Sequence, residues 1–312
     1  MIDKNMKILV AGAGTMGNSI AQGFATAGFN ATMYSRTQKT LDGAKTQIAA
    51  SLKTCEEMNL LGGQKIADIM GRLSYTTSLE EDAKGAGFVL ETVAENPDVK
   101  KDIFAQLEKH VATDTIIASN ASFLNIYNLA DLKHMERLVI AHYYAPAHII
   151  PLVEVVPGPQ TSEATMQKTV EIMEAVGKAP IRMKKFGVGF IVNRIQKAIG
   201  ECCMDMIQEG LVEPTDIDSA VKNTLGIRLP IVGVIQTFDF QGLDNLYAIQ
   251  QNAKKVYAFV EDRVKAGEYG VKTSKGLYDY QGRTPAEILA KRDELFIKMH
   301  EFLKSVNAFD PV

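Results

Sequence analysis

A histidine and a glutamate occur in two neighbouring apolar segments, and both types suit proton transfer. His142 ends the run Leu138–His142, and Glu154 lies inside Leu152–Val156. A buried glutamate is costly unless it is paired, and a histidine beside it satisfies the carboxylate and becomes a better base. Moving a hydride on or off an alcohol carbon also moves a proton at the same oxygen, which a histidine can accept or donate. Periodicity alone leaves a satisfied core histidine equally open.

A glycine-rich turn near the start of the chain is the second chemical signal. Residues 12–17 read Gly12-Ala13-Gly14-Thr15-Met16-Gly17, after an apolar run and before a helical pattern. In nucleotide-binding turns of this kind, the first glycine permits the tight turn and the second lets the backbone approach a pyrophosphate. The third allows close packing of helix and strand, and free N–H groups at the helix N-terminus bind phosphate. The motif alone is weak, but this context favours nucleotide binding over a purely structural turn.

The residues after the second apolar run indicate which dinucleotide is bound. An NAD site usually has Asp or Glu about 20 residues after the glycine turn to hold the ribose hydroxyls. This chain has Ser35-Arg36-Thr37 there. Ser35 does not repel a 2′-phosphate, Arg36 can pair with one and Thr37 can hydrogen-bond it. We therefore expect NADP in preference to NAD. In the alternative, Arg36 stacks on the adenine or points into water.

Strand-like and helix-like segments alternate in the first part of the chain, as in a doubly wound sheet. Residues 38–70 read as two amphipathic helices broken near residues 61–63, which makes a helical insert. The fold class that this order predicts is α/β, with a Rossmann-type doubly wound sheet. The expected strands are 7–11, 31–34, 73–76, 88–91, 115–119, 138–141, 151–156 and 180–183.

The pattern changes near residue 186, after which no segment reads convincingly as a strand. Residues 190–209 have a wide apolar stripe at helical spacing, which we expect to be buried, and Gly210 stops this helix. Thr284 to Glu287 reads as a capping box with proline at the first helical position. We therefore expect a dinucleotide-binding domain over 1–185 and a smaller all-helical domain over 186–312.

Composition excludes several classes of protein. With 312 residues, 46% of them hydrophobic and 23% charged, the chain is globular and has room for two domains. The net charge of −3 points to neither nucleic acid nor an anionic membrane, and we expect no membrane span and no signal peptide. Cys55, Cys202 and Cys203 and the five histidines match no metal-site spacing, so we expect no metal and reduced thiols in the cytoplasm.

Taken together, the motifs resemble the 3-hydroxyacyl-CoA dehydrogenases. That family has, in the same order, the glycine turn, the segment Ser119–Ser122, the His142 and Glu154 segments, residues 189–194 and a closing segment, 272–280. The resemblance spans about residues 6–280. It implies a soluble NAD(P)-dependent oxidoreductase of fatty acid metabolism that acts on a secondary alcohol in a small molecule, a CoA thioester. It also implies a homodimer formed through the helical domain, with the active site between the domains.

The same resemblance implies catalytic roles for four residues. His142 would be the general base in alcohol oxidation and the general acid in ketone reduction, and Glu154 would orient it. Ser122 would hydrogen-bond the reacting oxygen or the nicotinamide, and Asn193 would hold the substrate at the start of a helix. In the alternative, Ser122 and Asn193 are only helix N-caps.

Three further residues match positions that line the cofactor site in that family. They are Glu95, Lys100 and Asn120. For Lys100 the alternative is a solvated charge on a helix surface.

The resemblance is weaker in three places. The family usually reads His-Phe-Phe-Asn-Pro after the catalytic histidine, whereas this chain has Ala145 at the asparagine position. Residues 150–159 look like the lambda-crystallin (gulonate dehydrogenase) and carnitine dehydrogenase branch, and the tail after Tyr280 resembles that of enzymes for small hydroxy acids or ring alcohols. The leading expectation is a dehydrogenase of 3-hydroxybutyryl-CoA. A dehydrogenase of a small free hydroxy acid or ring alcohol, and a catalytically silent nucleotide-binding protein, remain open.

Overall fold

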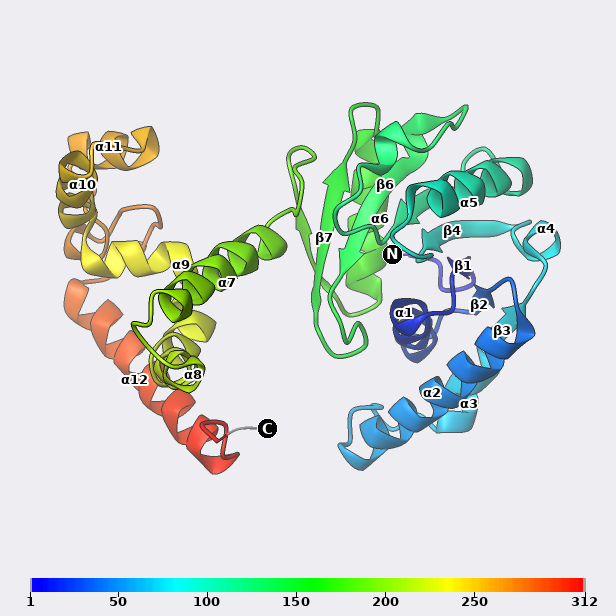
Figure 1. The fold of residues 1–312 in the computed structure, drawn as a ribbon, viewed down its shortest axis with the longest axis horizontal. Helices are drawn as coiled ribbons and strands as arrows, with labels where there is room; N and C mark the ends of the chain where they lie inside the picture. Colours follow the sequence, from blue (N-terminus) through cyan, green and yellow to red (C-terminus); the bar gives the residue numbers. More distant parts are fainter. Residues whose placement is uncertain (1, 311–312) are drawn as a thin grey trace. The chain divides into compact units, whose positions relative to one another are not determined.

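The computed structural model describes residues 2–310, and the chain divides into two compact units between Ala198 and Ile199 (Figure 1). The first unit contains a sheet of eight strands with helices on both faces, and the second is helical. This is the predicted fold class. No helix in residues 2–310 is both long enough and apolar enough to span a bilayer.

The sheet has the strand order β3-β2-β1-β4-β5-β6-β7-β8. The neighbouring strands from β3 to β6 pair in parallel, β6 and β7 are antiparallel, and β8 is parallel to β7. The reversal at β7 brings its start to the sheet edge where β6 ends. The strands are β1 (Lys7–Ala11), β2 (Ala31–Tyr34), β3 (Leu73–Thr76), β4 (Ala86–Glu91), β5 (Ile116–Ser119), β6 (Leu138–Tyr143), β7 (Leu152–Pro157) and β8 (Ala179–Arg182).

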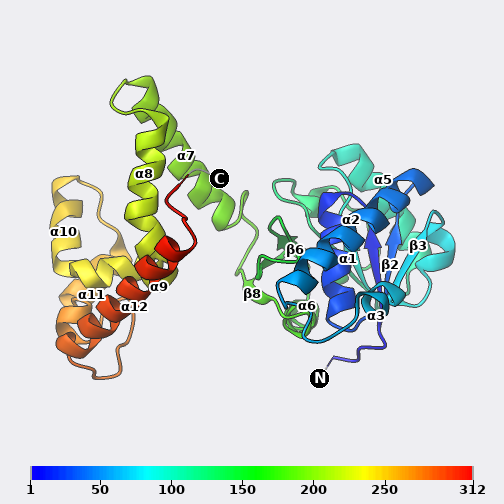
Figure 2. The ribbon, with the colours of Figure 1, turned by 90° about the horizontal axis from the view of Figure 1, so that it is seen from below.

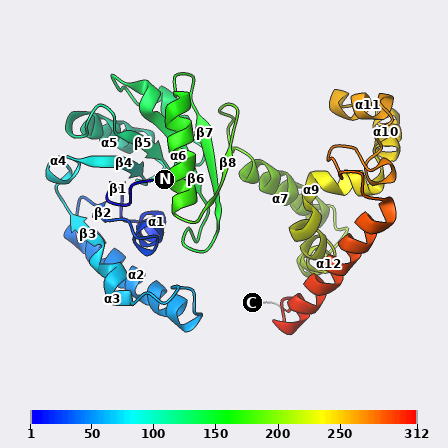
Figure 3. The same ribbon diagram turned by 180° about the vertical axis from the view of Figure 1, so that it is seen from behind.

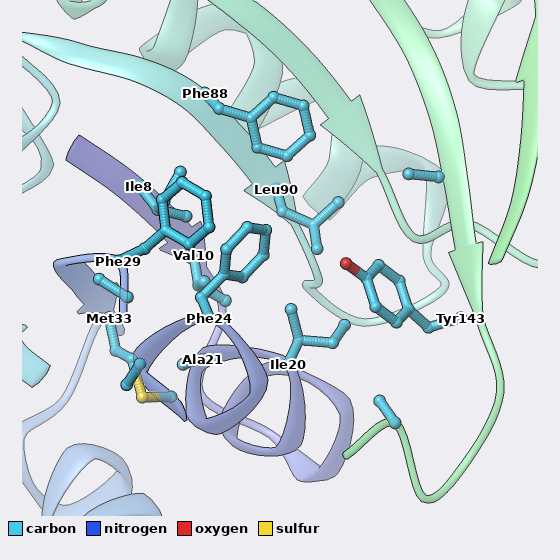
Figure 4. Close-up of a cluster of buried hydrophobic side chains, with 14 of the residues drawn as sticks. Ile8, Val10, Ile20, Ala21, Phe24, Phe29, Met33, Phe88, Leu90 and Tyr143 are labelled. Carbon is cyan, nitrogen blue, oxygen red and sulfur yellow. The ribbon is translucent and has the colours of Figure 1, made fainter. Parts of the chain in front are cut away.

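Helices bury both faces of the sheet, so its central strands are apolar on both sides. Ile8 and Val10 of β1 pack with α1 and α6, while Leu9 of β1 packs with α5 on the opposite face. Figure 2 shows α1 and α6 on the same side of the sheet, and Figure 4 shows Phe24 of α1 directed toward Leu90 of β4. The helices of this unit are α1 (Thr15–Thr26), α2 (Gln38–Glu57), α3 (Ile66–Gly71), α4 (Leu79–Asp82), α5 (Pro97–His110) and α6 (Glu163–Ala175).

The helical insert follows the predicted pattern. The first helix, α2, ends at Glu57, and α3 begins at Ile66, so the break spans the predicted glycine-containing segment. Gly62 and Gly63 within it both have positive φ angles, 57° and 81°, which glycine adopts at little cost.

In the described part of the second unit, residues 199–310, the structure has helices and isolated bridges only. The predicted capping box is confirmed, because Thr284 and Glu287 exchange both hydrogen bonds at the start of α12. Helices α10 and α11 pack side by side (Figure 3). The helices are α7 (Val192–Gln208), which begins in the first unit, α8 (Pro214–Asn223), α9 (Leu225–Gln241), α10 (Leu243–Asn252), α11 (Ala258–Lys265) and α12 (Pro285–Ser305).

The closing segment of the family resemblance, residues 272–280, is anchored by a buried carboxylate. Asp239 of α9 is fully buried and accepts the N–H groups of Leu277 and Tyr278, each at 2.9 Å, and the hydroxyl of Tyr280 at 3.1 Å. A Cβ on Gly276 would lie 2.5 Å from Asp239 Oδ1. The glycine of this segment is therefore explained by close packing.

The apolar stripe of residues 190–209 does not have the predicted burial. Helix α7 buries none of its residues, and Ile195, Ile199 and Ile207 remain 42%, 45% and 39% exposed. An apolar stripe on a helix is normally covered by another surface, and within residues 2–310 these three isoleucines are only partly covered. The division into compact units falls within α7, after Ala198, and the expected domain boundary at residue 185 stays a prediction. The division falls there because the first turn of α7 is hydrogen-bonded to β7, as described below.

Candidate active site

His142 and Glu154 are direct cross-strand partners. They occupy facing positions of the antiparallel pair β6 and β7, and His142 Nδ1 lies 2.9 Å from Glu154 Oε2. Both residues are buried, with exposed fractions of 3% and 0%. Facing residues of an antiparallel pair point to the same side of the sheet, so the strand register itself brings the two side chains together.

Every oxygen of the Glu154 carboxylate is hydrogen-bonded. Besides His142, Oε2 accepts the hydroxyl of Tyr144 at 2.7 Å, and Oε1 accepts the N–H groups of Ile191 and Val192 at 2.9 and 3.1 Å. Burial raises the pKa of Glu154, but the bonds from His142, Tyr144 and the two backbone groups outweigh it and hold the pKa below its usual value. An ionised Glu154 fixes the imidazole with Nδ1–H toward the carboxylate and leaves Nε2 for chemistry.

Ser122 lies against the other nitrogen of the imidazole. Its Oγ is 3.1 Å from His142 Nε2. It is not a helix N-cap, because the short helix that follows, Ile126–Asn128, is capped by Asn125. His142 Nε2 and Ser122 Oγ thus form a pair of polar groups that can meet one substrate oxygen.

Glu95 holds the loop that carries Ser122. Its Oε1 accepts the consecutive backbone N–H groups of Ser122, Phe123 and Leu124 at 3.0, 2.9 and 3.1 Å. The ammonium of Lys100 lies 3.4 Å from the other oxygen of Glu95. Glu95 therefore acts on the site through the backbone of the Ser122 loop.

Lys100 is buried and is not a solvated helix charge. Only 1% of its side chain is exposed, and its ammonium lies 2.9 Å from both carboxylate oxygens of Glu91, which also accepts the hydroxyl of Ser119. Nearby, Asn120 Oδ1 accepts the N–H of Tyr143 at 2.8 Å, which ties the end of β5 to the end of β6. Lys100 and Asn120 thus brace the strand ends that present Ser122 and His142.

Asn193 is the second residue of α7 and so is not its N-cap. The two residues before it donate to Glu154, and its own backbone hydrogen-bonds the hydroxyl of Tyr144. The first turn of α7 is therefore fixed to the His142–Glu154 pair, which brings Asn193 to the same site.

A groove of about 740 Å³ lies at the glycine turn, which follows β1. In the sheet β1 lies between β2 and β4, so the strand order reverses at this point. Open sheets bind ligands at such a point, where the strand order reverses. The groove is lined by Gly12, Ala13, Gly14, Thr15, Met16, Tyr34, Ser35, Arg36, Thr40, Thr92, Val93, Ala94, Asp98, Val99, Asp102, Ile103 and Gln106.

The glycine turn fits a dinucleotide. Gly12 has a φ of 132°, and a Cβ on Gly17 would lie 2.0 Å from the carbonyl oxygen of Gly12. A Cβ on Gly14 would meet no atom within 4 Å, so the backbone there faces open space. Gly14 is also the N-cap of α1, and its glycine supplies no capping side chain, so the first N–H groups of the helix are available to a phosphate.

The three residues expected to contact the ribose divide into two groups. Ser35 and Arg36 line the groove, whereas Thr37 caps α2 by accepting the N–H of Thr40 at 3.3 Å. The groove is also lined by two residues of α5, Asp98 and Asp102, which the sequence analysis did not predict. Their spacing places them on one helix face, but the sequence does not indicate that this face borders the groove.

Two aromatic residues of the site were also missed. The rings of Tyr144 and Phe190 lie 4.7 and 5.2 Å from that of His142, both edge-on. Tyr144 could have been found, because side chains alternate along an extended chain and Tyr144, directly after the end of β6, is two positions after His142. Phe190 precedes α7, and only the folded path of residues 183–191 brings it to the histidine.

Comparison with known proteins identifies both parts of the chain. Residues 7–186 match the family model of the 3-hydroxyacyl-CoA dehydrogenase NAD binding domain, and residues 189–280 match that of the C-terminal domain. Lambda-crystallin from Oryctolagus cuniculus is 34% identical over 232 residues, which cover 74% of this chain and 73% of the relative.

Two relatives named as enzymes match over longer stretches. A probable 3-hydroxybutyryl-CoA dehydrogenase of Bacillus subtilis is 32% identical over 287 residues, 89% of this chain and 98% of the relative. The 5-formyl-3-hydroxy-2-methylpyridine 4-carboxylate 5-dehydrogenase of Mesorhizobium japonicum is 26% identical over 305 residues, 95% of this chain and 98% of the relative.

Proposed function

The chain belongs to the 3-hydroxyacyl-CoA dehydrogenase family, and from this premise we propose that it interconverts 3-hydroxybutyryl-CoA and acetoacetyl-CoA with His142 as the acid/base. The observation that carries the proposal is the His142–Glu154 pair, with His142 Nε2 directed at Ser122. A binding protein without catalysis has no chemical need for this set of residues.

The proton step follows from the hydrogen bonds of the imidazole. In alcohol oxidation Nε2 of His142 accepts the hydroxyl proton, and the ionised Glu154 stabilises the positive charge that forms on the ring. In ketone reduction the same proton returns to the oxygen. Ser122 Oγ hydrogen-bonds this oxygen in both directions, and Asn193 holds the substrate beside it. The glycine turn, Ser35 and Arg36 would hold NAD(P) in the groove, and the cofactor would supply the hydride chemistry that accompanies this proton transfer.

For the cofactor we propose NADPH in preference to NADH. Ser35 and Arg36 line the groove, and the carboxylate that usually excludes a 2′-phosphate is missing from this position. Glu95, Lys100 and Asn120 support the cofactor side of the site indirectly, because they hold the strand ends and the Ser122 loop.

A second candidate substrate class is a small free hydroxy acid or ring alcohol. Two features favour it: Ala145 follows Tyr144 where CoA-dependent relatives usually have asparagine, and α12 lies beyond the family match, which ends at residue 280. The Mesorhizobium relative, whose name gives a pyridine carboxylate as substrate, matches through this tail as well.

Turnover assays separate these candidates. The purified protein is mixed with acetoacetyl-CoA, and NADH and NADPH oxidation are followed in separate reactions, which are repeated with free acetoacetate and with small aromatic aldehydes and keto acids. Rapid turnover of the CoA ester supports the proposal. Turnover confined to free acids or ring compounds supports the second class, and tight cofactor binding without turnover of any compound rejects an enzymatic role.

We also propose a homodimer formed through the helical unit. Its support is the exposed apolar stripe of α7, which includes Ile195, Ile199 and Ile207 and is only partly covered within residues 2–310. Light scattering after gel filtration tests this proposal, and a monomer at micromolar concentration would reject it.

A further inference from the structure

Tyr144 shares the carboxylate that orients the catalytic histidine. Its hydroxyl lies 2.7 Å from Glu154 Oε2, the same oxygen that lies 2.9 Å from His142 Nδ1. The other oxygen, Oε1, already accepts the backbone N–H groups of Ile191 and Val192 at the start of α7. Tyr144 and His142 therefore draw on one oxygen of a fully buried carboxylate.

The hydroxyl of Tyr144 is a neutral donor in this position. Burial raises the pKa of Tyr144, and the adjacent Glu154 raises it further, so the phenol keeps its proton throughout the neutral range. Its ring packs edge-on against the imidazole with a centroid separation of 4.7 Å. The ring and the hydroxyl thus have separable effects, and a phenylalanine keeps the first while removing the second.

We propose that Tyr144 is a positioning residue that shares Glu154 with His142 and weakens the hold of the carboxylate on the imidazole proton. This inference rests on the proposed acid/base function of His142. A hydrogen bond donated to a carboxylate lowers the basicity of that carboxylate, and a less basic carboxylate stabilises an adjacent imidazolium less. Tyr144 therefore favours the neutral imidazole, the form that accepts a proton in alcohol oxidation.

The other charged groups near the imidazole are separate from this effect. From β7 the group facing His142 is Glu154, and from the end of β6 it is Tyr144. On the side of β5, Ser122 contacts Nε2, and behind it lie Glu95 and then Lys100. Glu95 hydrogen-bonds the backbone of the Ser122 loop and Lys100 hydrogen-bonds Glu91, so a change at Tyr144 reaches His142 through Glu154.

The test compares Tyr144→Phe with Tyr143→Phe. The hydroxyl of Tyr143 lies 2.9 Å from the sulfur of Met173, away from Glu154, so it provides a control with the same chemical change one residue away. We expect Tyr144→Phe to move the acidic limb of the kcat/KM profile for alcohol oxidation to higher pH by about 0.5–1 unit. Tyr143→Phe should leave this limb in place.

An NMR titration gives a second readout that needs no substrate. Protein labelled at histidine is titrated, and the His142 signal is assigned from its loss in His142→Gln. The His142 titration curve should move to higher pH in Tyr144→Phe. In the Glu154→Gln background the same substitution should produce no further movement, because the shared carboxylate is gone.

The outcomes separate this inference from the proposed function. A His142 titration curve that is unchanged in Tyr144→Phe, or one that moves equally with and without Glu154, overturns the role of Tyr144. If no alcohol or ketone is turned over, the proposed function fails, while the titration still decides the inference about Tyr144. Should Tyr144→Phe be unfolded, the comparison of wild type with Tyr144→Leu in the same titration replaces it, since leucine also lacks a hydrogen-bond donor.

Discussion

Glu154 lies directly opposite His142 in the register of the antiparallel strands β6 and β7, with 2.9 Å between Oε2 and Nδ1. A slip of one residue in this pairing would send Glu154 to the other face of the sheet. The geometry of the pair therefore depends on backbone pairing and not on a flexible loop. The same carboxylate fixes the first turn of α7, so one buried group orients the histidine and positions Asn193.

The glycine turn predicts different results for two neighbouring glycines. Gly17→Ala should destabilise the fold by roughly 2–4 kcal/mol, because the added Cβ would lie 2.0 Å from the carbonyl oxygen of Gly12. Gly14→Ala should fold with nearly wild-type stability, since open space surrounds that position, but should lose about tenfold or more in cofactor affinity. Thermal melting and cofactor titration measure both. Wild-type cofactor affinity in Gly14→Ala would argue against a pyrophosphate at this turn.

The choice of dinucleotide is tested at the end of β2. Ser35→Asp introduces a charge that repels a 2′-phosphate and can hold ribose hydroxyls, so it should shift the NADPH/NADH preference toward NADH by roughly tenfold to a hundredfold. Arg36→Ala should weaken NADPH and leave NADH nearly unchanged. The measurement is kcat/KM for each cofactor. A wild-type protein that already favours NADH by about tenfold shows that the reading of Ser35 and Arg36 is wrong.

We predict that Glu95 makes the free energy of unfolding depend on pH. Burial raises the pKa of Glu95, but the N–H groups of Phe123, Leu124 and Ser122 and the charge of Lys100 lower it below the ordinary value of 4.5. The ionised carboxylate therefore stabilises the fold above the pKa of the unfolded chain, and this contribution is lost as the pH falls through the lower, folded-state pKa.

Thermal melting between pH 3 and 7 measures the effect. Glu95→Gln should be less stable than wild type near neutral pH, and the difference should shrink as the pH falls below about 4.5. Glu80→Gln, at an exposed position of α4, is the control and should follow wild type throughout. A difference between wild type and Glu95→Gln that stays constant with pH contradicts this account of the Ser122 loop.

We predict that replacing Ser122 lowers the catalytic rate but leaves the protein folded. Ser122→Ala should lower kcat by about 10–100-fold, because the hydrogen bond to the reacting oxygen is removed, and should change the melting temperature little, because Ser122 caps no helix. Steady-state kinetics and melting on the same preparation test both parts. A large drop in melting temperature with unchanged kcat would return Ser122 to a structural role.

The sequence was most informative where local rules decide the structure. The strands, the break between α2 and α3 and the capping box at Thr284 follow from apolar runs, glycines and capping residues close together in the chain. The contact of His142 with Glu154 could also be predicted from the sequence, because two short apolar segments joined by a short connection can pair as neighbouring strands.

Long-range packing explains what the sequence did not reveal. Lys100 reads as an ordinary helix lysine, and only the fold brings Glu91 and Glu95 to it. Asp98 and Asp102 border the groove because of how α5 follows β4. The stripe of α7 was predicted to be buried because its spacing is that of a core helix, but spacing alone does not show what covers an apolar face.

The most direct test of the account is the rate of hydride transfer in His142→Ala, followed by nicotinamide absorbance in a single turnover with the substrate that the wild type converts. We predict a rate lower by about 10²–10⁴-fold, with the cofactor Kd nearly unchanged, while His300→Ala, at an exposed position of α12, retains the wild-type rate. A His142→Ala rate within about tenfold of wild type would contradict the assignment of the proton to His142.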